Sequence, residues 1–446
     1  MRMIFKCIFD SKNFLELKTF YSTQRGNSMS KHIQTVLPSC ILSIVLGAVF
    51  FENIIFLIYM SLYIVVAFSI YFLGVKREKK IELSQDDEKF LQDLAANTLE
   101  YFNRNISEKT LICDNYQVFP KRGANSFTSP TNIGFALLSY VCAHKLGKIS
   151  EGEALKNLDG QLVIIEGLEK YKGHLYNWYS LATQKPLCPY FVSSVDSGNF
   201  IASLIVIKSF VKDLDEGIYK RVCTLIDGCD FDALFDSSRG KFYIGYNGEK
   251  NSFEGHYDML ASEARTLCYI ASAIKGNTAY FNGLARNIVK LKGNTLVSWS
   301  GTAFEYLMPQ LFLSDCNGSL LTKSCKNIVK IMQKSRCSNV WGISESCYFE
   351  FNDDNSYKYS AFGVSSIRLN GGKDRCVISP YSTALALKYS PKKAIANLRK
   401  LKDMGMNTSM GMYDAIDFTN GSNIVATLMT HHQGMLLCGI VNTLYD

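Results

Sequence analysis

Patterns that bind metals or nucleotides are missing from this 446-residue sequence. Its 14 cysteines and six histidines form no CxxC pair and no Cys/His cluster with the spacing of zinc ligands, which argues against a structural zinc site. No GxGxxG motif follows an expected strand, and no GxxxxGK[ST] motif occurs, so nucleotide binding has no support. The GxSxG motif of serine hydrolases is also absent. We therefore expect neither a metal nor an organic cofactor.

Positive charge is scarce outside the N-terminal region. The chain has 48 Lys and Arg against 40 Asp and Glu, and residues 1–80 hold six of the eight net positive charges. The remainder is close to neutral and lacks the basic surface that a nucleic-acid partner requires. The cysteines are scattered and make up about 3% of the chain, too few for a disulfide scaffold. We interpret them as free thiols in a reducing compartment, mostly buried as small apolar side chains.

One long apolar run covers residues 35–75, interrupted only by Glu52 and Asn53. A membrane-spanning helix needs about 20 residues, so the run predicts a transmembrane hairpin of 35–51 and 54–75. The first span is the weaker one, because it is short and contains Pro38 and Gly47, and insertion of the second alone would leave the topology open. A signal peptide is disfavoured, since the run starts late and is too long.

The charges beside this hairpin predict its orientation. Basic residues precede and follow it, and the turn between the spans has none. The positive-inside rule then places both chain ends in the cytoplasm. The expected organisation is a basic N-terminal cytoplasmic segment (1–34), the hairpin (35–75), a basic linker (76–84) and a body (85–446) that faces the cytoplasm.

The body is predicted to be mostly helical. Apolar residues recur at helical spacing, and short strands are expected only at 173–179 and 240–246. The expected helices are 86–102, 129–145, 151–170, 197–213, 217–227, 258–274, 277–291, 302–314, 319–334, 381–389, 392–403 and 422–443.

Loops between these helices combine acidic residues, aromatics and glycines. Aromatic faces stack on sugar rings, and a pair of carboxylates is what the cleavage of a glycosidic bond requires. The same residues also occur together on ordinary protein surfaces. His431 and His432 are adjacent and diverge on a helix, so a metal site there is disfavoured.

The motifs, taken in order, resemble the glycoamylase-like domain that forms the middle, cyclising part of bacterial cyclic β-1,2-glucan synthases. The resemblance covers roughly residues 85–443. The motifs are TSPTNIG (128–134), GHLYNWY (173–179), VDSGN (195–199), IGYN (244–247), YDMLASEAR (257–265), SWSGTAFEYLMP (298–309), WGISES (341–346), YKYSAFGV (357–364), SPYSTALAL (379–387), YDAIDFT (413–419) and HHQGM (431–435).

This resemblance implies an all-α (α/α)6 toroid with a few short β-hairpins, acting on β-1,2-glucan by hydrolysis or transglycosylation. In the synthases the domain follows a membrane-embedded glycosyltransferase and precedes a phosphorylase-like domain, and this sequence has no room for either. We therefore expect a detached domain at the bacterial inner membrane, with a separate glycosyltransferase as its partner.

By the same resemblance Glu263 and Glu345 form the catalytic pair, with the assignment of acid and of nucleophile or base left open. The remaining residues are expected to bind substrate. Asp196, Asp258 and Glu305 would hold hydroxyls of the substrate or support the residues that do, and Asn199 and Asp414 would also bind substrate. Trp178, Trp299, Trp341 and Tyr257 would stack on sugars. Arg265 would grip a neighbouring loop or the substrate, and His431, His432 and Gln433 would line the cleft.

Structural roles compete with several of these assignments. Asp196 stands where a helix begins and could act as its N-cap, and Glu305 could cap or pair within its own helix. Trp299 and Trp341 could be core residues. Asp414 replaces the Glu expected at its position, and segments 333–340 and 368–376 depart from the family pattern, which affects substrate register more than fold.

Two classes of function follow. The first is a membrane-tethered glycoside hydrolase or transglycosylase that acts on β-1,2-glucan through its glutamate pair. The second is a non-catalytic glucan-binding module or assembly partner of a separate synthase, which the departures from the pattern favour. A decaying remnant is a third reading, and the intact motif set weighs against it.

Overall fold

The computed structural model describes residues 29–74, 83–107, 110–314, 316, 318–369 and 375–445. The chain divides into two compact units near residue 81. Most of the expected basic N-terminal segment (1–28) and most of the linker (75–82) lie outside the described residues.

The N-terminal unit contains two apolar helices, α3 (Met29–Val49) and α4 (Ile54–Gly74), which pack against each other. Asn53 begins α4, since its side-chain oxygen accepts from the backbone N–H of Phe56 at 3.1 Å. The stretch His32–Val49 is long and apolar enough to cross a membrane, and the apolar part of α4, Ile54–Ser69, is shorter. An N-terminal helix of this kind serves as a membrane anchor or as a signal sequence.

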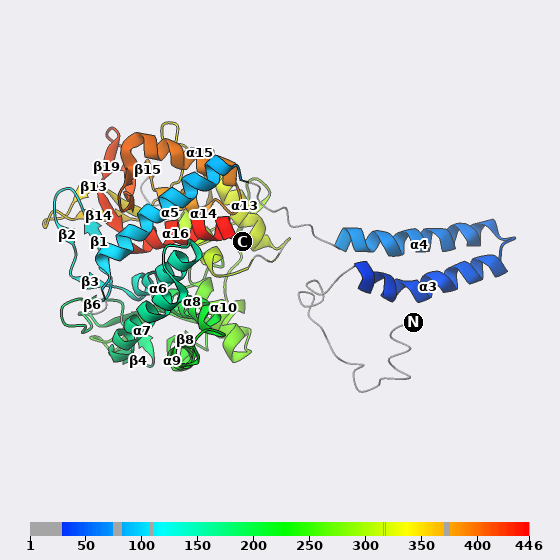
Figure 1. Ribbon diagram of the computed structural model, residues 1–446, viewed down its shortest axis with the longest axis horizontal. Coiled ribbons are helices and arrows are strands. Elements are labelled where there is room, and N and C mark those ends of the chain that lie inside the picture. Colours follow the sequence, from blue (N-terminus) through cyan, green and yellow to red (C-terminus); the bar gives the residue numbers. More distant parts are fainter. Residues whose placement is uncertain are drawn as a thin grey trace. The chain divides into compact units, whose positions relative to one another are not determined.

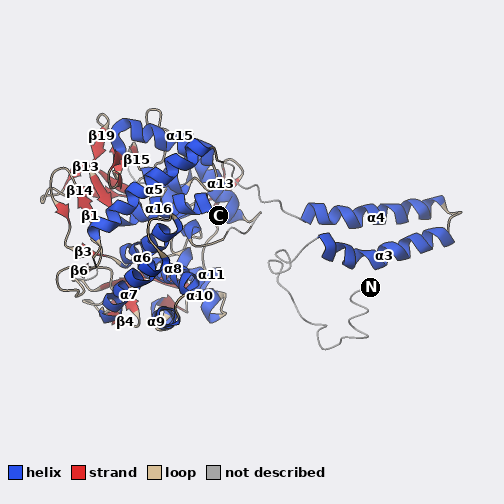
Figure 2. Ribbon diagram, in the orientation of Figure 1, coloured by secondary structure: helices blue, strands red, loops and turns tan. Residues whose placement is uncertain are grey.

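The C-terminal unit is mainly helical, with strands gathered at one side of Figure 2. Figure 1 colours its helices by their order in the sequence, from blue to red. They are α5 (Gln85–Asn105), α6 (Pro130–Lys145), α7 (Glu151–Gly167), α8 (Ser194–Val211), α9 (Glu216–Asp227), α10 (Arg265–Lys275), α11 (Ala279–Asn282), α12 (Ala303–Leu307), α13 (Leu320–Met332), α14 (Pro380–Leu385), α15 (Pro391–Leu401) and α16 (Thr430–Tyr445).

These helices alternate between two layers. Helices α6, α8 and α10 contact one another in turn, as do α12, α14 and α16, and α16 returns to α6. Arg265 at the start of α10 joins the two runs, because its guanidinium donates to the carbonyl oxygens of Glu305 and Tyr306 in α12. Each of the other six helices packs outside an inner one.

Local sequence explains where many helices begin. Serine hydroxyls accept from the backbone N–H three residues later at the starts of α5, α6, α7, α8 and α13, which is the usual N-cap interaction. Proline occupies the first turn of α6, α14 and α15, where its missing N–H costs no hydrogen bond. Helix α8 is apolar enough to span a membrane, but 67% of that stretch is buried in the body, so it is a core helix.

Short antiparallel strands line the loops. The larger sheets have the orders β10-β9-β7, β2-β1-β20 and β15-β18-β19, and β13 pairs with β14. The strands are β1 (Asn115–Gln117), β2 (Gly123–Ala124), β3 (Phe127–Thr128), β4 (Lys170–Tyr171), β5 (His174–Leu175), β6 (Tyr179–Ser180), β7 (Phe191–Ser193), β8 (Phe235–Asp236), β9 (Lys241–Asn247), β10 (Ser252–His256), β11 (Ile288–Lys290), β12 (Asn294–Leu296), β13 (Ser346–Phe351), β14 (Tyr357–Ser360), β15 (Val377–Ile378), β16 (Asn407–Thr408), β17 (Gly411–Met412), β18 (Ala415–Asp417), β19 (Asn423–Val425) and β20 (Thr427–Met429).

Three expected helices differ from the structure. The segment 258–264 is a loop and α10 begins only at Arg265, while 277–291 contains the four-residue α11 and strand β11. The segment 422–443 begins with strands β19 and β20 before α16. In each case an apolar stretch is buried by strand pairing across a loop, which helical periodicity alone does not reveal.

The prediction that the cysteines are all free thiols is wrong at one pair. Cys337 and Cys376 form a disulfide between residues 39 apart in sequence, with their Cα atoms 5.8 Å apart. Ile343 and Ile378, a few residues further on, also pair as an antiparallel β-bridge. The other cysteines of the described residues form no disulfide bond.

Candidate active site

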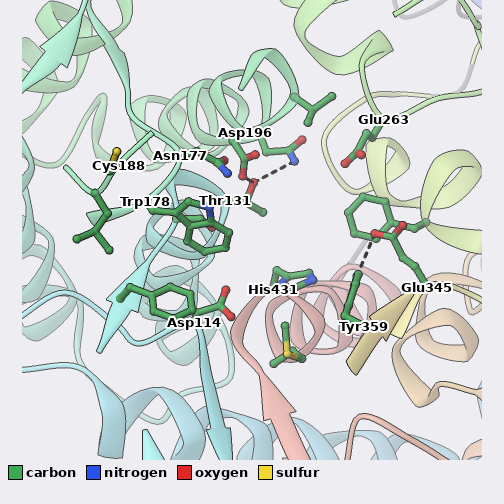
Figure 3. Close-up of a pocket in the computed structure, with 17 residues that line it drawn as sticks. Asp114, Thr131, Asn177, Trp178, Cys188, Asp196, Glu263, Glu345, Tyr359 and His431 are labelled. Carbon is green, nitrogen blue, oxygen red and sulfur yellow. Dashed lines mark hydrogen bonds between the residues drawn. The ribbon is translucent and has the colours of Figure 1, made fainter. Parts of the chain in front are cut away.

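A pocket of about 590 Å³ opens among the loops and inner helix starts. Figure 3 shows Glu263 and Glu345 in its wall, with Asp196, Asn177 and Trp178 further along and His431 between. Six of the predicted site residues line it: Trp178, Asp196, Asn199, Glu263, Glu345 and His431.

Glu263 enters the pocket from the loop that leads into α10. Burial raises the pKa of its carboxyl group well above the ordinary value, and the nearby carboxylate of Glu345 adds to this effect. Gly198 of α8 lets α10 approach, because a Cβ atom there would lie 2.7 Å from the side chain of Leu267. A carboxyl group in such a place favours its protonated form.

Glu345 enters from the segment just before β13. Gly342 positions this segment, because its φ of +125° and a Cβ contact of 2.6 Å with Ser382 exclude a larger residue. Burial raises the pKa of Glu345 to about 7, against the lowering effects of His432 and of the Tyr359 hydroxyl. That hydroxyl donates to Glu345 Oε1 at 3.1 Å.

Asp196 lies in the first turn of α8, but it is not the N-cap. Ser193 caps the helix by accepting from the Asp196 N–H. The Asp196 carboxylate is therefore free to accept from the Thr131 hydroxyl at 2.6 Å. The amide of Asn199 donates to the same hydroxyl at 3.2 Å, and its own oxygen is buried without a partner. Burial raises the pKa of Asp196.

Trp178 forms an aromatic wall of the pocket. Its ring meets Phe127 edge-on, with centroids 4.9 Å apart. With the Asn177 amide oriented to match its partners, its oxygen accepts from the Trp178 indole N–H at 3.0 Å and its nitrogen donates to Asp196 Oδ2 at 2.8 Å. The Asp196 carboxylate therefore binds Thr131 in the first turn of α6 and, through Asn177, orients the Trp178 ring.

His431 and His432 differ in their position relative to the pocket. His431 lines the pocket, and burial together with the neighbouring His432 lowers the pKa of its imidazole well below the ordinary value. His432 and Asp414 are each 1% exposed and lie behind the wall. His432 Nδ1 and Asp414 Oδ1 are 2.5 Å apart. Neither contacts the pocket directly, which corrects their predicted substrate-binding role.

Glu305 and Arg265 do not line the pocket, and both have the structural roles that were predicted as alternatives to substrate contact. Glu305 completes a capping box with Thr302 at the start of α12, and its carboxylate also accepts from Ser298 and Ser300. Arg265 is fully buried and donates to backbone carbonyls of α12. The second reading of Glu305, as a residue that caps its own helix, is thus the one observed.

Trp341 and Gln433 are buried away from the pocket. Trp341 is 4% exposed and belongs to the core, so it offers no stacking surface. Gln433 is 2% exposed and donates to the carbonyl oxygen of Met412 at 2.7 Å. Both predicted contacts with substrate are absent because helix packing covers these side chains.

Tyr257, Asp258 and Trp299 are outside the residues that line the pocket. Trp299 is 45% exposed and its indole N–H donates to Asp258 Oδ1 at 2.9 Å. The core reading of Trp299 is therefore wrong. Tyr257 lies close enough to the carboxylates for them to raise its pKa, in addition to its burial.

Sequence reasoning missed several residues of the pocket. Asp114 accepts from Asn132 at 2.8 Å and from Asn115 at 3.1 Å, and burial raises its pKa. Its local sequence belongs to none of the motifs. Four further pocket residues lie within the quoted motifs, which was the available signal: Thr131, Asn177, Phe304 and Tyr359.

The described residues contain no group of three or more His, Cys, Asp or Glu side chains that could hold a metal ion. The side chains that line the pocket include carboxyl, hydroxyl, amide and imidazole groups. Two partly buried carboxyl groups that influence each other are the arrangement expected for acid–base work on an acetal.

Comparison with known proteins agrees with this geometry. Residues 256–446 match the Glycoamylase family model, described as "Putative glucoamylase". This chain is similar to that family over those residues. It is related to the cyclic β-(1,2)-glucan synthase NdvB of Rhizobium meliloti (strain 1021), which is 26% identical over 517 residues covering 84% of this chain. The chain spans 18% of the length of that synthase. The resemblance predicted from the motifs is confirmed.

Solved structures share the fold of this chain. The endo-β-1,2-glucanase of Chitinophaga pinensis, in complex with sophorotriose and glucose, matches with a TM-score of 0.67 and 16% identity, covering 81% of this chain and 93% of that one. The endo-β-1,2-glucanase of Talaromyces funiculosus with sophorose gives 0.67 and 14%, covering 81% and 86%. A mainly helical glucoamylase-like fold with short hairpins is therefore established.

Proposed function

We propose that the chain is a glycosidase that cleaves β-1,2-glucan by means of Glu263 and Glu345. The observation that carries this proposal is the pair of mutually influencing carboxyl groups in one pocket. An aromatic wall and several hydrogen-bonding side chains beside them suit a sugar chain. The β-1,2 linkage rests on relatedness to the glucan synthase and on the fold shared with the glucanases.

The surroundings of the two carboxyl groups support a different role for each. Glu263 is held toward the protonated state by burial and by neighbouring carboxylates, so it is the proton donor to the glycosidic oxygen. Glu345 accepts a hydroxyl hydrogen bond from Tyr359, so it acts as the carboxylate that attacks the anomeric carbon or activates the acceptor. Water as the acceptor gives hydrolysis, and a hydroxyl of the same glucan chain gives a ring.

The finer architecture is part of the proposal. Six inner and six outer helices with the contacts described above support an (α/α)6 toroid. The apolar helices α3 and α4 support a membrane tether. Flanking positive charges favour a body in the cytoplasm, whereas the disulfide Cys337–Cys376 favours an oxidising compartment. Protease treatment of intact spheroplasts, which digests only an externally exposed body, distinguishes the two sides.

Incubation of the full chain in detergent with linear β-1,2-glucan tests the function. We expect products that Glu345→Gln and Glu263→Gln do not form, while both variants still bind the polymer. Mass spectrometry identifies rings, which lack one water relative to linear products. Binding without turnover by the unaltered chain would instead support a non-catalytic glucan-binding partner of a separate glycosyltransferase. Turnover of another glucan alone would refute the linkage.

A further inference from the structure

Behind Glu345 the structure holds a continuous line of polar side chains that the proposed chemistry does not itself require. The Tyr359 hydroxyl lies 3.1 Å from Glu345 Oε1 and 3.4 Å from His432 Nε2. His432 Nδ1 in turn lies 2.5 Å from Asp414 Oδ1. These residues come from β14, from α16 and from the residue before β18.

The donors and acceptors available on each side chain decide which group donates in each hydrogen bond of this line. Both oxygens of Asp414 have donors, since Oδ1 faces His432 and Oδ2 accepts from the Cys347 N–H at 2.8 Å, which is the pattern of an ionised carboxylate. A buried carboxylate needs a compensating charge, and the imidazolium form of His432 supplies it. The Nε2–H of His432 then donates to the Tyr359 oxygen. The one hydroxyl proton of Tyr359 is therefore donated to Glu345.

Tyr381 contacts two members of this line, His432 and Glu345. Its ring stacks on His432 with centroids 4.0 Å apart and planes 16° apart, a geometry that favours a cationic imidazole. Its hydroxyl donates to the backbone oxygen of Glu345 at 2.9 Å. The same side chain therefore sets the ring plane of His432 and the position of the Glu345 backbone.

We propose that Asp414, His432 and Tyr359 are positioning residues that orient the Glu345 side chain and keep it ionised. This inference rests on the proposed function for its meaning in catalysis. Asp414 and His432 act on the reaction without touching the sugar. Other titratable groups face Glu345 from the elements around it, and they would act on it in every variant: Glu263, Glu305, Tyr257, Tyr381 and His431.

We call Asp414, His432 and Tyr359 the relay. The pH dependence of kcat/KM on linear β-1,2-glucan tests its role in the full chain. His432→Gln removes the charge, so we expect the acidic limb to move up by about one pH unit, with kcat about 10- to 100-fold lower at neutral pH. Asp414→Asn should act in the same direction. Tyr359→Phe, at a pocket-lining position outside the core, should give a smaller shift and guards against misfolding.

Asp417→Asn is the matched control. Asp417 is equally buried on β18, but it accepts from the Phe349 N–H and from Arg375 and not from the relay. We expect lower stability and an unchanged acidic limb. An acidic limb that stays in place in His432→Gln, or one that moves equally in Asp417→Asn, would overturn the relay.

A direct readout separates failure of the relay from failure of the proposed function. The infrared band of the protonated Glu345 carboxyl is the one that Glu345→Gln removes, and its pH titration needs no substrate. We expect His432→Gln to shift that titration to higher pH even if the glucan proves to be another polymer. An unchanged titration would refute the relay, whereas a shifted titration without turnover would refute only the function.

Discussion

The two walls that carry Glu263 and Glu345 support their carboxyl groups in opposite ways. Burial is the largest influence on the pKa of both groups, and the charged groups that act on Glu263 are other carboxylates, which raise its pKa further. Around Glu345 a tyrosine hydroxyl and a histidine counteract burial. The difference shows that two glutamates in one pocket can have their pKa values influenced differently by the residues that surround each of them.

The Asp196 wall differs again. There a carboxylate binds Thr131 and Asn177, and the latter holds the Trp178 indole. In the proposed function, this geometry places neutral groups around the ligand and does not transfer a proton. The pocket thus divides into a reacting part and a positioning part, and the predictions below test that division.

Loss of either glutamate should have the largest effect. Glu263→Gln and Glu345→Gln should each lower kcat on the glucan by about 10²- to 10⁴-fold. On an oligosaccharyl fluoride, whose leaving group needs no proton, we expect Glu263→Gln to recover activity and Glu345→Gln to stay inactive. Equal recovery of both variants would contradict the roles assigned here. Glu153→Gln, at an exposed position of α7, serves as the control.

Loss of the Asp196 charge should have an intermediate effect. Asp196→Asn weakens the hydrogen bonds to Thr131 and Asn177, so we expect kcat/KM to fall about 10- to 100-fold, with recovery on the fluoride no better than on the glucan. Asp215→Asn, which alters the N-cap of α9 outside the pocket, should change stability alone. Recovery of Asp196→Asn on the fluoride would instead make Asp196 a proton donor.

The pH profile of the unaltered chain should be bell-shaped. Glu345 must be ionised, and its raised pKa of about 7 places the acidic limb near that pH. Glu263 must be protonated, and its raised pKa places the alkaline limb at higher pH than for an ordinary glutamate. Because the two groups interact, the limbs report the pair. An optimum below pH 5 would contradict both environments.

Removal of the disulfide should have the smallest effect on catalysis. Cys337→Ser with Cys376→Ser frees the segment on the Glu345 side, and we expect the free energy of unfolding to fall by about 2–4 kcal/mol with both pH limbs unchanged. Denaturant unfolding and the pH profile measure the two effects. A displaced acidic limb would mean that the disulfide, and not the hydrogen bonds, supports Glu345.

Much of the fold could be read from the sequence because its signals are local. Serine caps and first-turn prolines mark the starts of the inner and outer helices, and apolar spacing marks their buried faces. The segment 422–443 could not be read in this way, because its strands exist only through pairing with β18 and β1.

The motifs were sufficient to predict some residues of the candidate site. They could not show which side chains helix packing buries away from the pocket. Glu263 and Glu345 came from the motifs, and the structure brings both into one pocket. Arg265 could not be distinguished from a substrate ligand, because its carbonyl partners are 40 residues away in sequence. Trp341 and Trp299 look alike in sequence, yet one is buried in the core and the other is exposed.

A crystal structure of Glu263→Gln with a β-1,2-glucan oligosaccharide tests the central claim most directly. We predict that the sugar chain lies across the pocket against Trp178, with one glycosidic bond between position 263 and Glu345. The amide at 263 should lie on the side of the leaving oxygen, and Glu345 on the side of the anomeric carbon. An oligosaccharide bound elsewhere, or with every glycosidic bond distant from both residues, would contradict the account.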